Sequence, residues 1–275
     1  MEVITLQSGS NGNCVYVEAD GVQLLFDAGI SGTQAEKRLA AHGKDIRDID
    51  ALIISHEHSD HVRCMGVFQR KFGLPIHVST PTMQATQKKA KIGRVDDVHH
   101  FDSGSTLAFG RVRVETLCTP HDACDSVAFV VDDGSSRLGI LTDIGHVDCD
   151  LDHVVGTLDA VILESNYDPA MLHNGPYPEQ LKNRIRGSRG HLSNEECADL
   201  LNRKASSRLQ WACLGHLSEH NNRPDLVLQT HRKMIRRDLR MHVADRYNAG
   251  AVMSVAANRT QQTFWETSAN PLKPR

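Results

Sequence analysis

The apolar residues of this 275-residue chain fall into short runs separated by glycine-rich or polar turns. Short apolar or alternating runs of this kind are typical of β-strands. We expect a first meander of strands at residues 3–6, 13–18 and 22–26, and a second at 105–109, 111–117, 126–131 and 138–141. Further strands are expected at residues 51–54, 74–78, 161–163 and 209–214.

Helical patterns lie between these strands. Ser193 and Glu196 form a capping box that predicts the start of one helix. Other helices are expected at residues 33–42, where Gly43 stops the pattern, and at 60–72, 81–92, 179–185 and 223–240. The order of strands and helices predicts an α/β chain, with two sheets packed together and helices outside. We expect one domain over 1–275, with two halves near 1–100 and 101–248 and a loosely ordered tail at 249–275.

Composition narrows the class of protein. The net charge is −3, so no global positive field points to nucleic acid, and partner choice depends on local patches. The seven cysteines are scattered without a C-x-x-C pair, which suits a reducing cytosol. No signal peptide or membrane-spanning run is found, so we expect a soluble cytoplasmic protein without a membrane partner. Aromatic residues make up only 5% of the chain, which argues against a base-stacking platform for single strands.

The segment Ser55-His56-Glu57-His58-Ser59-Asp60-His61 packs three histidines and two carboxylates directly behind an apolar strand. In an extended loop His56 and His58 point the same way, whereas Asp60 and His61 begin the next turn and can face a second point. Neutral imidazole and carboxylate are suitable ligands for Zn²⁺, Mn²⁺ or Fe²⁺. The motif can therefore serve two metal ions. The alternative is a polar loop that is merely rich in histidine.

Polar residues also follow other apolar runs. His121, Asp143, Glu164 and His216 each stand at or just beyond the end of such a run. We therefore expect them to share one sheet edge with the histidine motif. Asp27 ends the third strand, where a carboxylate either caps a helix or orients a metal-bound histidine from behind.

Several polar loops are candidates for binding the substrate. The glycine-rich turn Ser8–Asn13 is either a plain tight turn or a cradle for a phosphate. His191 stands just before a predicted helix start, either as a neighbour of an anionic ligand or as an exposed loop residue. The basic stretch Arg232–Arg240 is either a solvated helix face or a phosphate-facing stripe. The residues expected to contact substrate are Ser8, Asn11, Asn13, Asn166, Arg184, Arg186, Arg189 and Ser193.

The order of the ligand candidates resembles the metallo-β-lactamase superfamily over essentially the whole length of the chain. The resemblance implies a four-layer αββα sandwich of two mixed sheets, with a dinuclear metal site along one edge. It implies that one ion is held by His56, His58 and His121, the other by Asp60, His61 and His216, and that Asp143 bridges both. His191 and His216 stand in nearly identical Gly-His-Leu-Ser tetrads, and we prefer His216 as the ligand because it directly follows an apolar strand.

Shorter segments resemble the YycJ/WalJ branch of that superfamily. They are Ser8–Cys14, Glu164–Asp168, Gly175–Pro178, Gly190–Asn194 and His216–Asn222. This branch implies 5′-to-3′ exonuclease activity on double-stranded DNA. His220 departs from the branch, in which we expect an acidic residue at this position. The Glu164 and His191 pair resembles the glutamate and histidine with which tRNA 3′-processing relatives move a proton.

The expected function is therefore hydrolysis of phosphodiester bonds at DNA duplex ends by a metal-bridged hydroxide. The candidate catalytic residues are Asp60, Glu164 and His191, with His191 as general acid for the leaving 3′-oxygen. The cofactors are two divalent ions, Zn²⁺ or Mn²⁺ or else Fe²⁺. The alternatives are a small-molecule phosphodiesterase, a thioester hydrolase of the same fold, and a catalytically idle metal-binding or DNA-binding module.

Overall fold

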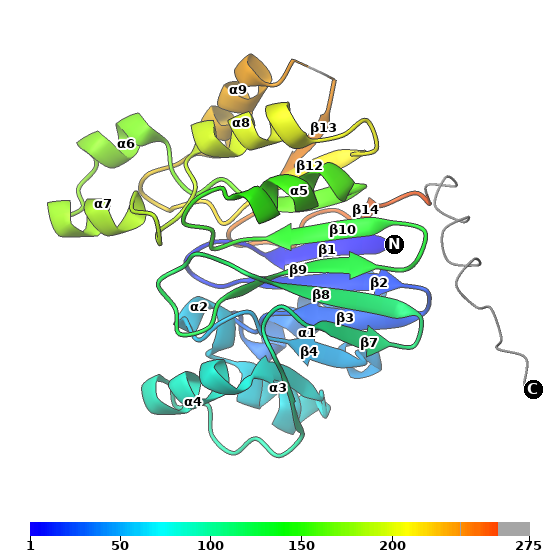
Figure 1. Cartoon of the computed structure of the whole chain (residues 1–275). Helices are drawn as coiled ribbons and strands as arrows, with labels where there is room; N and C mark the ends of the chain where they lie inside the picture. Colours follow the sequence, from blue (N-terminus) through cyan, green and yellow to red (C-terminus); the bar gives the residue numbers. More distant parts are fainter. Residues whose placement is uncertain (237, 258–275) are drawn as a thin grey trace, which may run out of the picture.

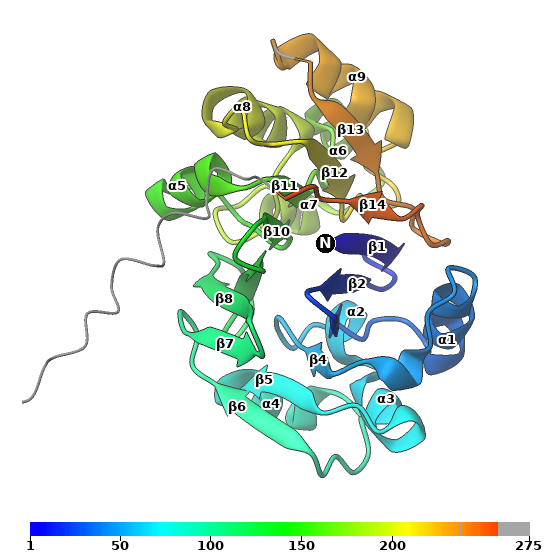
Figure 2. The same cartoon turned by 90° about the vertical axis from the view of Figure 1, so that its right-hand side faces the viewer.

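The computed structural model describes residues 1–236 and 238–257, and these form two seven-stranded sheets with helices on their outer faces (Figures 1 and 2). The first sheet contains β1 (Glu2–Gln7), β2 (Cys14–Ala19), β3 (Val22–Phe26), β4 (Ala51–Ile53), β5 (Ile76–Ser79), β6 (Val98–Phe101) and β14 (Met253–Ser254). The second contains β7 (Thr106–Phe109), β8 (Val112–Cys118), β9 (Val127–Asp132), β10 (Arg137–Leu141), β11 (Ala160–Glu164), β12 (Trp211–Gly215) and β13 (Arg240–Val243). Their orders are β14-β1-β2-β3-β4-β5-β6 and β13-β12-β11-β10-β9-β8-β7.

The helices make two outer layers. They are α1 (Gly32–Ala40), α2 (Ser59–Val62), α3 (Met65–Phe72), α4 (Thr80–Lys89), α5 (Cys149–Thr157), α6 (Pro169–Asn174), α7 (Glu179–Ile185), α8 (Asn194–Lys204) and α9 (Pro224–Met234), with a 3₁₀ turn at Ile46–Asp48. One apolar core lies between the sheets, where the rings of Phe26 and Phe129 pack with centroids 5.0 Å apart. A second core joins the first sheet to α1 and α3, and a third joins the second sheet to α5, α8 and α9. The four-layer αββα prediction is confirmed.

Sheet topology determines where the site lies. Strands β3 to β6 are parallel, and so are β10 to β13. Strand β8 runs in the same direction as β10, because both are antiparallel to β9. The carboxyl ends of β3 and β4 therefore meet at one edge of the first sheet, and those of β8, β10, β11 and β12 at one edge of the second. The segments that follow these strand ends carry the candidate ligands.

Several predicted boundaries were wrong. The helix predicted at 60–72 is two helices, interrupted between Val62 and Met65. The basic helix predicted at 223–240 ends at Met234, and Arg240 begins β13, which pairs with β12. Residues 249–257 include β14, which pairs with β1, so the predicted loose tail is wrong for this part. Residues 258–275 and Arg237 lie outside the described residues.

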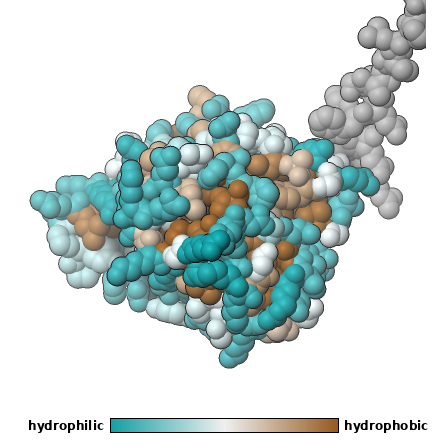
Figure 3. All heavy atoms as spheres, turned by 90° about the horizontal axis from the view of Figure 1, so that it is seen from below, coloured by the Kyte–Doolittle hydropathy of each residue, from teal (hydrophilic) through white to brown (hydrophobic). Residues whose placement is uncertain are grey.

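Among the described residues, no helix is both long and apolar enough to cross a membrane. The face seen from below in Figure 3 is largely hydrophilic, with apolar atoms visible in a band between the polar ones.

Candidate metal centre

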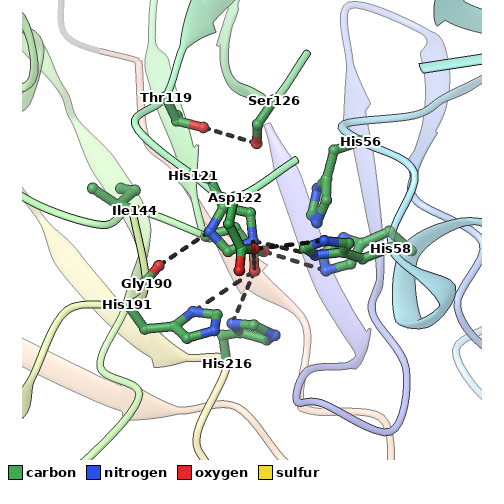
Figure 4. A network of polar contacts seen from close by, with 12 residues as sticks. His56, His58, Thr119, His121, Asp122, Ser126, Ile144, Gly190, His191 and His216 are labelled. Atoms are coloured by element: carbon green, nitrogen blue, oxygen red, sulfur yellow. Dashed lines mark hydrogen bonds and ion pairs between the residues drawn. The ribbon is translucent and has the colours of Figure 1, made fainter. Parts of the chain in front are cut away.

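The predicted ligands come together between the two sheets at the edge described above (Figure 4). Asp27, Asp143 and His216 follow the ends of β3, β10 and β12, and each has a positive φ, of 63°, 58° and 54° respectively. Residues other than glycine rarely adopt this backbone conformation, and those that do often lie at functional sites. The left-handed turn bends the chain sharply at the strand end, so that each polar side chain is presented to the site.

A first ligand group consists of His56, His58 and His121. His121 Nε2 lies 3.2 Å from His58 Nδ1, and the rings of His56 and His121 are 5.1 Å apart and nearly perpendicular. His121 Nδ1 donates to the carbonyl oxygen of Gly190 at 3.0 Å, which leaves Nε2 to face the other two rings. These three imidazoles can converge on one ion.

A second group consists of Asp60, His61 and His216. Asp60 Oδ2 lies 3.4 Å from Nε2 of both histidines. Asp143 lies between the two groups, with its carboxylate 3.2 Å from His61 Nε2 and 3.6 Å from His121 Nε2. This carboxylate can therefore reach ions in both positions.

The chemistry of these residues fits divalent metal ions. His56 Nε2 is buried and has no hydrogen-bond partner among the described residues, which is costly for a ring nitrogen unless a ligand occupies it. Burial lowers the pKa of His56 well below its ordinary value, so the ring is neutral and offers a lone pair. Burial acts in the same direction on His61, but Asp143 and Asp27 outweigh it and hold its pKa well above the ordinary value. The buried carboxylates around His61 favour bound cations. Metal ions would supply this positive charge in place of the proton on His61.

Asp27 and Ser55 support the ligands from behind. His61 Nδ1 donates to Asp27 Oδ2 at 2.6 Å, which directs His61 Nε2 toward Asp60 and Asp143. Asp27 also accepts hydrogen bonds from the backbone N–H and the hydroxyl of Ser55, both at 2.9 Å. This is the geometry by which a carboxylate orients a metal-bound histidine.

Glu164 connects the two Gly-His-Leu-Ser tetrads, which contain His191 and His216. Its Oε1 accepts hydrogen bonds from Nδ1 of His191 and from Nδ1 of His216, each at 2.8 Å. Its Oε2 accepts from the backbone N–H groups of Ile144 and Leu192, at 3.0 Å and 3.1 Å. Burial raises the pKa of Glu164, but the two imidazoles outweigh this and lower it below its ordinary value. The carboxylate is ionised and its hydrogen-bonding capacity is used within the chain.

Four residues predicted to contact substrate support the ligands from behind, and their contact with substrate stays a prediction. Ser8 Oγ accepts the backbone N–H of His216 at 2.8 Å, and Asn166 Nδ2 donates to the carbonyl oxygen of His216 at 2.7 Å. Asn13 Nδ2 donates to Asp60 Oδ2 at 3.2 Å. Ser193 caps α8 in the predicted capping box. All four side chains are buried, so they hold the ligand loops rather than face a ligand from outside.

The arginines are distributed differently from expectation. Arg184 pairs with Asp122, whose Oδ1 is 3.6 Å from His58 Nε2, so this guanidinium lies at the edge of the site. Arg189 donates to the carbonyl oxygen of His121 at 2.8 Å and thereby holds the ligand loop. Arg186 pairs with Glu179 at 2.7 Å within α7 and its C-terminal turn, and no contact connects it to a ligand among the described residues.

The pattern of the metallo-β-lactamase superfamily matches residues 8–178. The chain belongs to this superfamily. Exodeoxyribonuclease WalJ of Streptococcus pneumoniae (strain D39) is 38% identical over 229 residues, which cover 82% of this chain and 84% of WalJ. Exodeoxyribonuclease YycJ of Bacillus anthracis is 34% identical over 222 residues, which cover 81% of this chain and 84% of YycJ. The solved structure of the metallo-β-lactamase fold protein YhfI from Bacillus subtilis has a TM-score of 0.69 at 18% identity, covers 92% of this chain and 98% of YhfI, and agrees with the fold.

This metallo-β-lactamase superfamily protein also contains a buried amide network that the sequence analysis missed. Asn222 Nδ2 donates to the carbonyl oxygen of Ser165 at 2.8 Å and to Asn194 Oδ1 at 2.8 Å. Asn194 Oδ1 also accepts the hydroxyl of Ser165 at 2.6 Å. The network joins the loop that directly follows Glu164, the last residue of β11, to the loop after β12 that carries His216. The available signal was an asparagine after each Gly-His-Leu-Ser tetrad, with Asn194 directly after the first and Asn222 four residues after the second.

Proposed function

We propose that this protein is a metal-dependent exodeoxyribonuclease that hydrolyses phosphodiester bonds from the 5′ ends of duplex DNA. The observation that carries the proposal is a complete set of seven convergent ligand residues together with the Glu164–His191 pair. The two curated relatives named above are both exodeoxyribonucleases, and each aligns with more than four fifths of this chain.

The proposed cofactors are two divalent ions, Zn²⁺ or Mn²⁺. His56, His58 and His121 would hold one, and Asp60, His61 and His216 the other, with Asp143 shared. The position of His216 Nε2 beside Asp60 supports His216 rather than His191 as the last ligand. When bound, such ions lower the pKa of a coordinated water and offset negative charge on the reacting phosphate.

His191 is the proposed proton donor to the leaving 3′-oxygen. Glu164 fixes its Nδ1, so Nε2 is the nitrogen that remains for the substrate. The hydrogen bond to this carboxylate holds the ring of His191 in place for proton transfer. The His191 side chain is 21% exposed, whereas that of His216 is 2% exposed, so His191 is the more accessible of the two to a phosphodiester.

One side-by-side assay tests the proposal. The purified protein is loaded with Mn²⁺ or Zn²⁺ and offered a 5′-labelled duplex, a single strand, a cyclic nucleotide phosphodiester and a glutathione thioester. We expect the labelled 5′-terminal nucleotide to be released from the duplex at the earliest times, before internal fragments appear. Turnover of the cyclic nucleotide or the thioester without degradation of DNA would contradict the proposal and favour the small-molecule hydrolases. His191→Ala serves as the inactive control.

A further inference from the structure

A second polar surface adjoins the candidate metal centre and is not used by the proposed chemistry. Its centre is Arg246, in the segment that follows β13. One guanidinium nitrogen of Arg246 donates to Asn11 Oδ1 at 3.3 Å, and another donates to the carbonyl oxygen of Leu217. Asn11 lies in the glycine-rich turn that also holds Asn13 against Asp60, and Leu217 directly follows His216. Arg246 therefore joins two loops that hold the ligands.

Arg246 is half-buried, yet no Asp or Glu oxygen lies within 4.0 Å of its guanidinium among residues 1–236 and 238–257. Arg137, which is also half-buried, is instead paired with both Glu115 and Asp132. Desolvating a cation without a carboxylate partner is unfavourable, and burial accordingly lowers the pKa of Arg246. Only two of its five N–H donors are used in the contacts described above. The remaining donors are suited to an anion from outside the chain.

The adjacent turn offers further donors. Gly12 N–H closes the turn on the carbonyl oxygen of Gly9 at 2.8 Å, and Gly9 N–H is bound by Asn13 Oδ1 at 2.9 Å. The backbone N–H groups of Ser10 and Asn11 have no partner within the part of the chain that the structure describes. A Cβ added to Gly9 would lie 3.2 Å from the guanidinium carbon of Arg246, so the bare glycine lets the arginine approach the turn closely. Backbone N–H groups beside a guanidinium are a typical phosphate-binding arrangement.

A tyrosine, Tyr247, directly follows Arg246, although aromatic residues are scarce in the chain. Tyr247 is 57% exposed and its hydroxyl donates to Glu219 at 3.0 Å. Tyr177, in the link between the projecting helices α6 and α7 (Figure 1), packs edge-on against His220 with ring centroids 5.7 Å apart. Glu219, Tyr247 and Tyr177 each raise the pKa of Arg246, although burial outweighs them. Exposed rings beside a cation are how proteins bind unpaired nucleotides, with bases stacked on the rings.

We propose that Arg246, the Ser10–Asn11 turn and the ring of Tyr247 bind the terminal nucleotide of the DNA strand, with its 5′-phosphate on Arg246. This inference rests on the proposed exonuclease function and specifies which strand end the site prefers. Such a contact would place the first phosphodiester bond at the metal ligands, because the loops that contact Arg246 are also the loops that hold the ligands. The competing explanation is that Arg246 only clamps these loops together.

The test compares kcat/KM for two duplexes that differ only in carrying a 5′-phosphate or a 5′-hydroxyl. We expect the wild type to prefer the 5′-phosphate by about ten- to a hundredfold, the effect of one or two charge-assisted hydrogen bonds. Arg246→Gln should bring this ratio close to one, and Arg246→Lys should retain part of it. An equal loss on both duplexes in Arg246→Gln would mean a clamp only and would overturn the inference.

Arg38→Gln is the matched control. Arg38 is half-buried and donates only to uncharged groups, including the carbonyl oxygens of Leu6 and Tyr247, so it clamps the same segment from the side of α1. If Arg246 were only a clamp, both variants should act alike. We expect Arg38→Gln to lower the thermal midpoint of unfolding while leaving the 5′-phosphate preference at the wild-type value. Loss of the preference in Arg38→Gln would count against a direct phosphate contact.

The ring is tested separately. Tyr247→Ala should raise KM for DNA about tenfold, the effect of losing one stacked base, whereas Tyr247→Phe should keep the wild-type KM. An unchanged KM in Tyr247→Ala would show that the ring does not stack on a base. A wild type that does not distinguish a 5′-phosphate from a 5′-hydroxyl would overturn the whole inference. Bis(p-nitrophenyl) phosphate is included as a minimal phosphodiester. Hydrolysis of this compound without any DNA degradation would instead defeat the exonuclease proposal and, with it, the end-recognition site.

Discussion

Asp27 Oδ2 accepts a hydrogen bond of 2.6 Å from Nδ1 of His61, and this contact determines which nitrogen of His61 is available as a ligand. We predict that Asp27→Asn lowers metal affinity about 10- to 100-fold, since partners of this kind orient the ring and raise its basicity. Titration with Zn²⁺ against a competing chelator measures the change. Asp20→Asn, at a surface turn distant from the ligands, is the control and should bind metal as the wild type does. An affinity for Zn²⁺ in Asp27→Asn equal to that of the wild type would contradict this role.

The division of ligands into two groups predicts two metal ions per chain. His61→Ala and His58→Ala each remove one ligand from a different group and should each reduce metal content from about two equivalents toward one. Elemental analysis of the dialysed proteins measures this. Full activity with a single equivalent in the wild type, or unchanged metal content in His61→Ala, would refute the two-ion arrangement.

The shared carboxylate of Glu164 makes His191 and His216 easy to confuse, and their alanine variants should separate them. His191→Ala should lower turnover on DNA by about 10²- to 10⁴-fold with metal content intact, because it removes a proton donor. His216→Ala should lose metal from the Asp60 and His61 position. Metal analysis and single-turnover rates on the same preparations decide the assignment, and the opposite pattern would exchange the two roles.

The sequence was sufficient to predict that the candidate ligands converge, because they follow apolar strands directly. In parallel sheets the carboxyl ends of strands share an edge, so His56, Asp143 and His216 could be expected to converge without knowledge of their distances. The position of Asn13 and Asn166 behind the ligands could not be predicted in this way. A polar residue in a loop has the same local pattern whether it faces substrate or supports a ligand from behind, and only tertiary burial distinguishes the two.

The prediction of secondary structure failed where the local sequence pattern and the strand pairing of the fold disagree. The two exposed histidines of β6 interrupt its apolar pattern, yet β6 pairs with β5 over four residues. The basic run after Met234 continues a helical pattern, but residues 240–243 pair with β12 instead. Pairing and burial outweigh intrinsic helix propensity in such segments. The alternative of a phosphate-facing stripe over Arg232–Arg240 loses its helical basis beyond Met234 for the same reason.

A buried histidine on α9 predicts how stability depends on pH. His231 on α9 is fully buried, its Nδ1 donates to the carbonyl oxygen of Val227 at 2.9 Å, and its Nε2 lies 3.2 Å from Cys197 Sγ. Burial lowers its pKa to about 4, against about 6.5 in an unfolded chain. Between these values the unfolded state binds more protons than the folded state, so stability falls as the pH falls from about 6.5 toward 4.

Between pH 7 and pH 5 this single group should cost about 2 kcal/mol of the free energy of unfolding. His231→Gln keeps a donor for Val227 but does not titrate in this range, so its stability should fall less than that of the wild type over the same interval. His153→Gln, on the exposed face of α5, is the matched control and should follow the wild type. Urea unfolding of the three proteins at both pH values measures the difference. Parallel losses in all three would show that another group dominates the acid sensitivity of the fold.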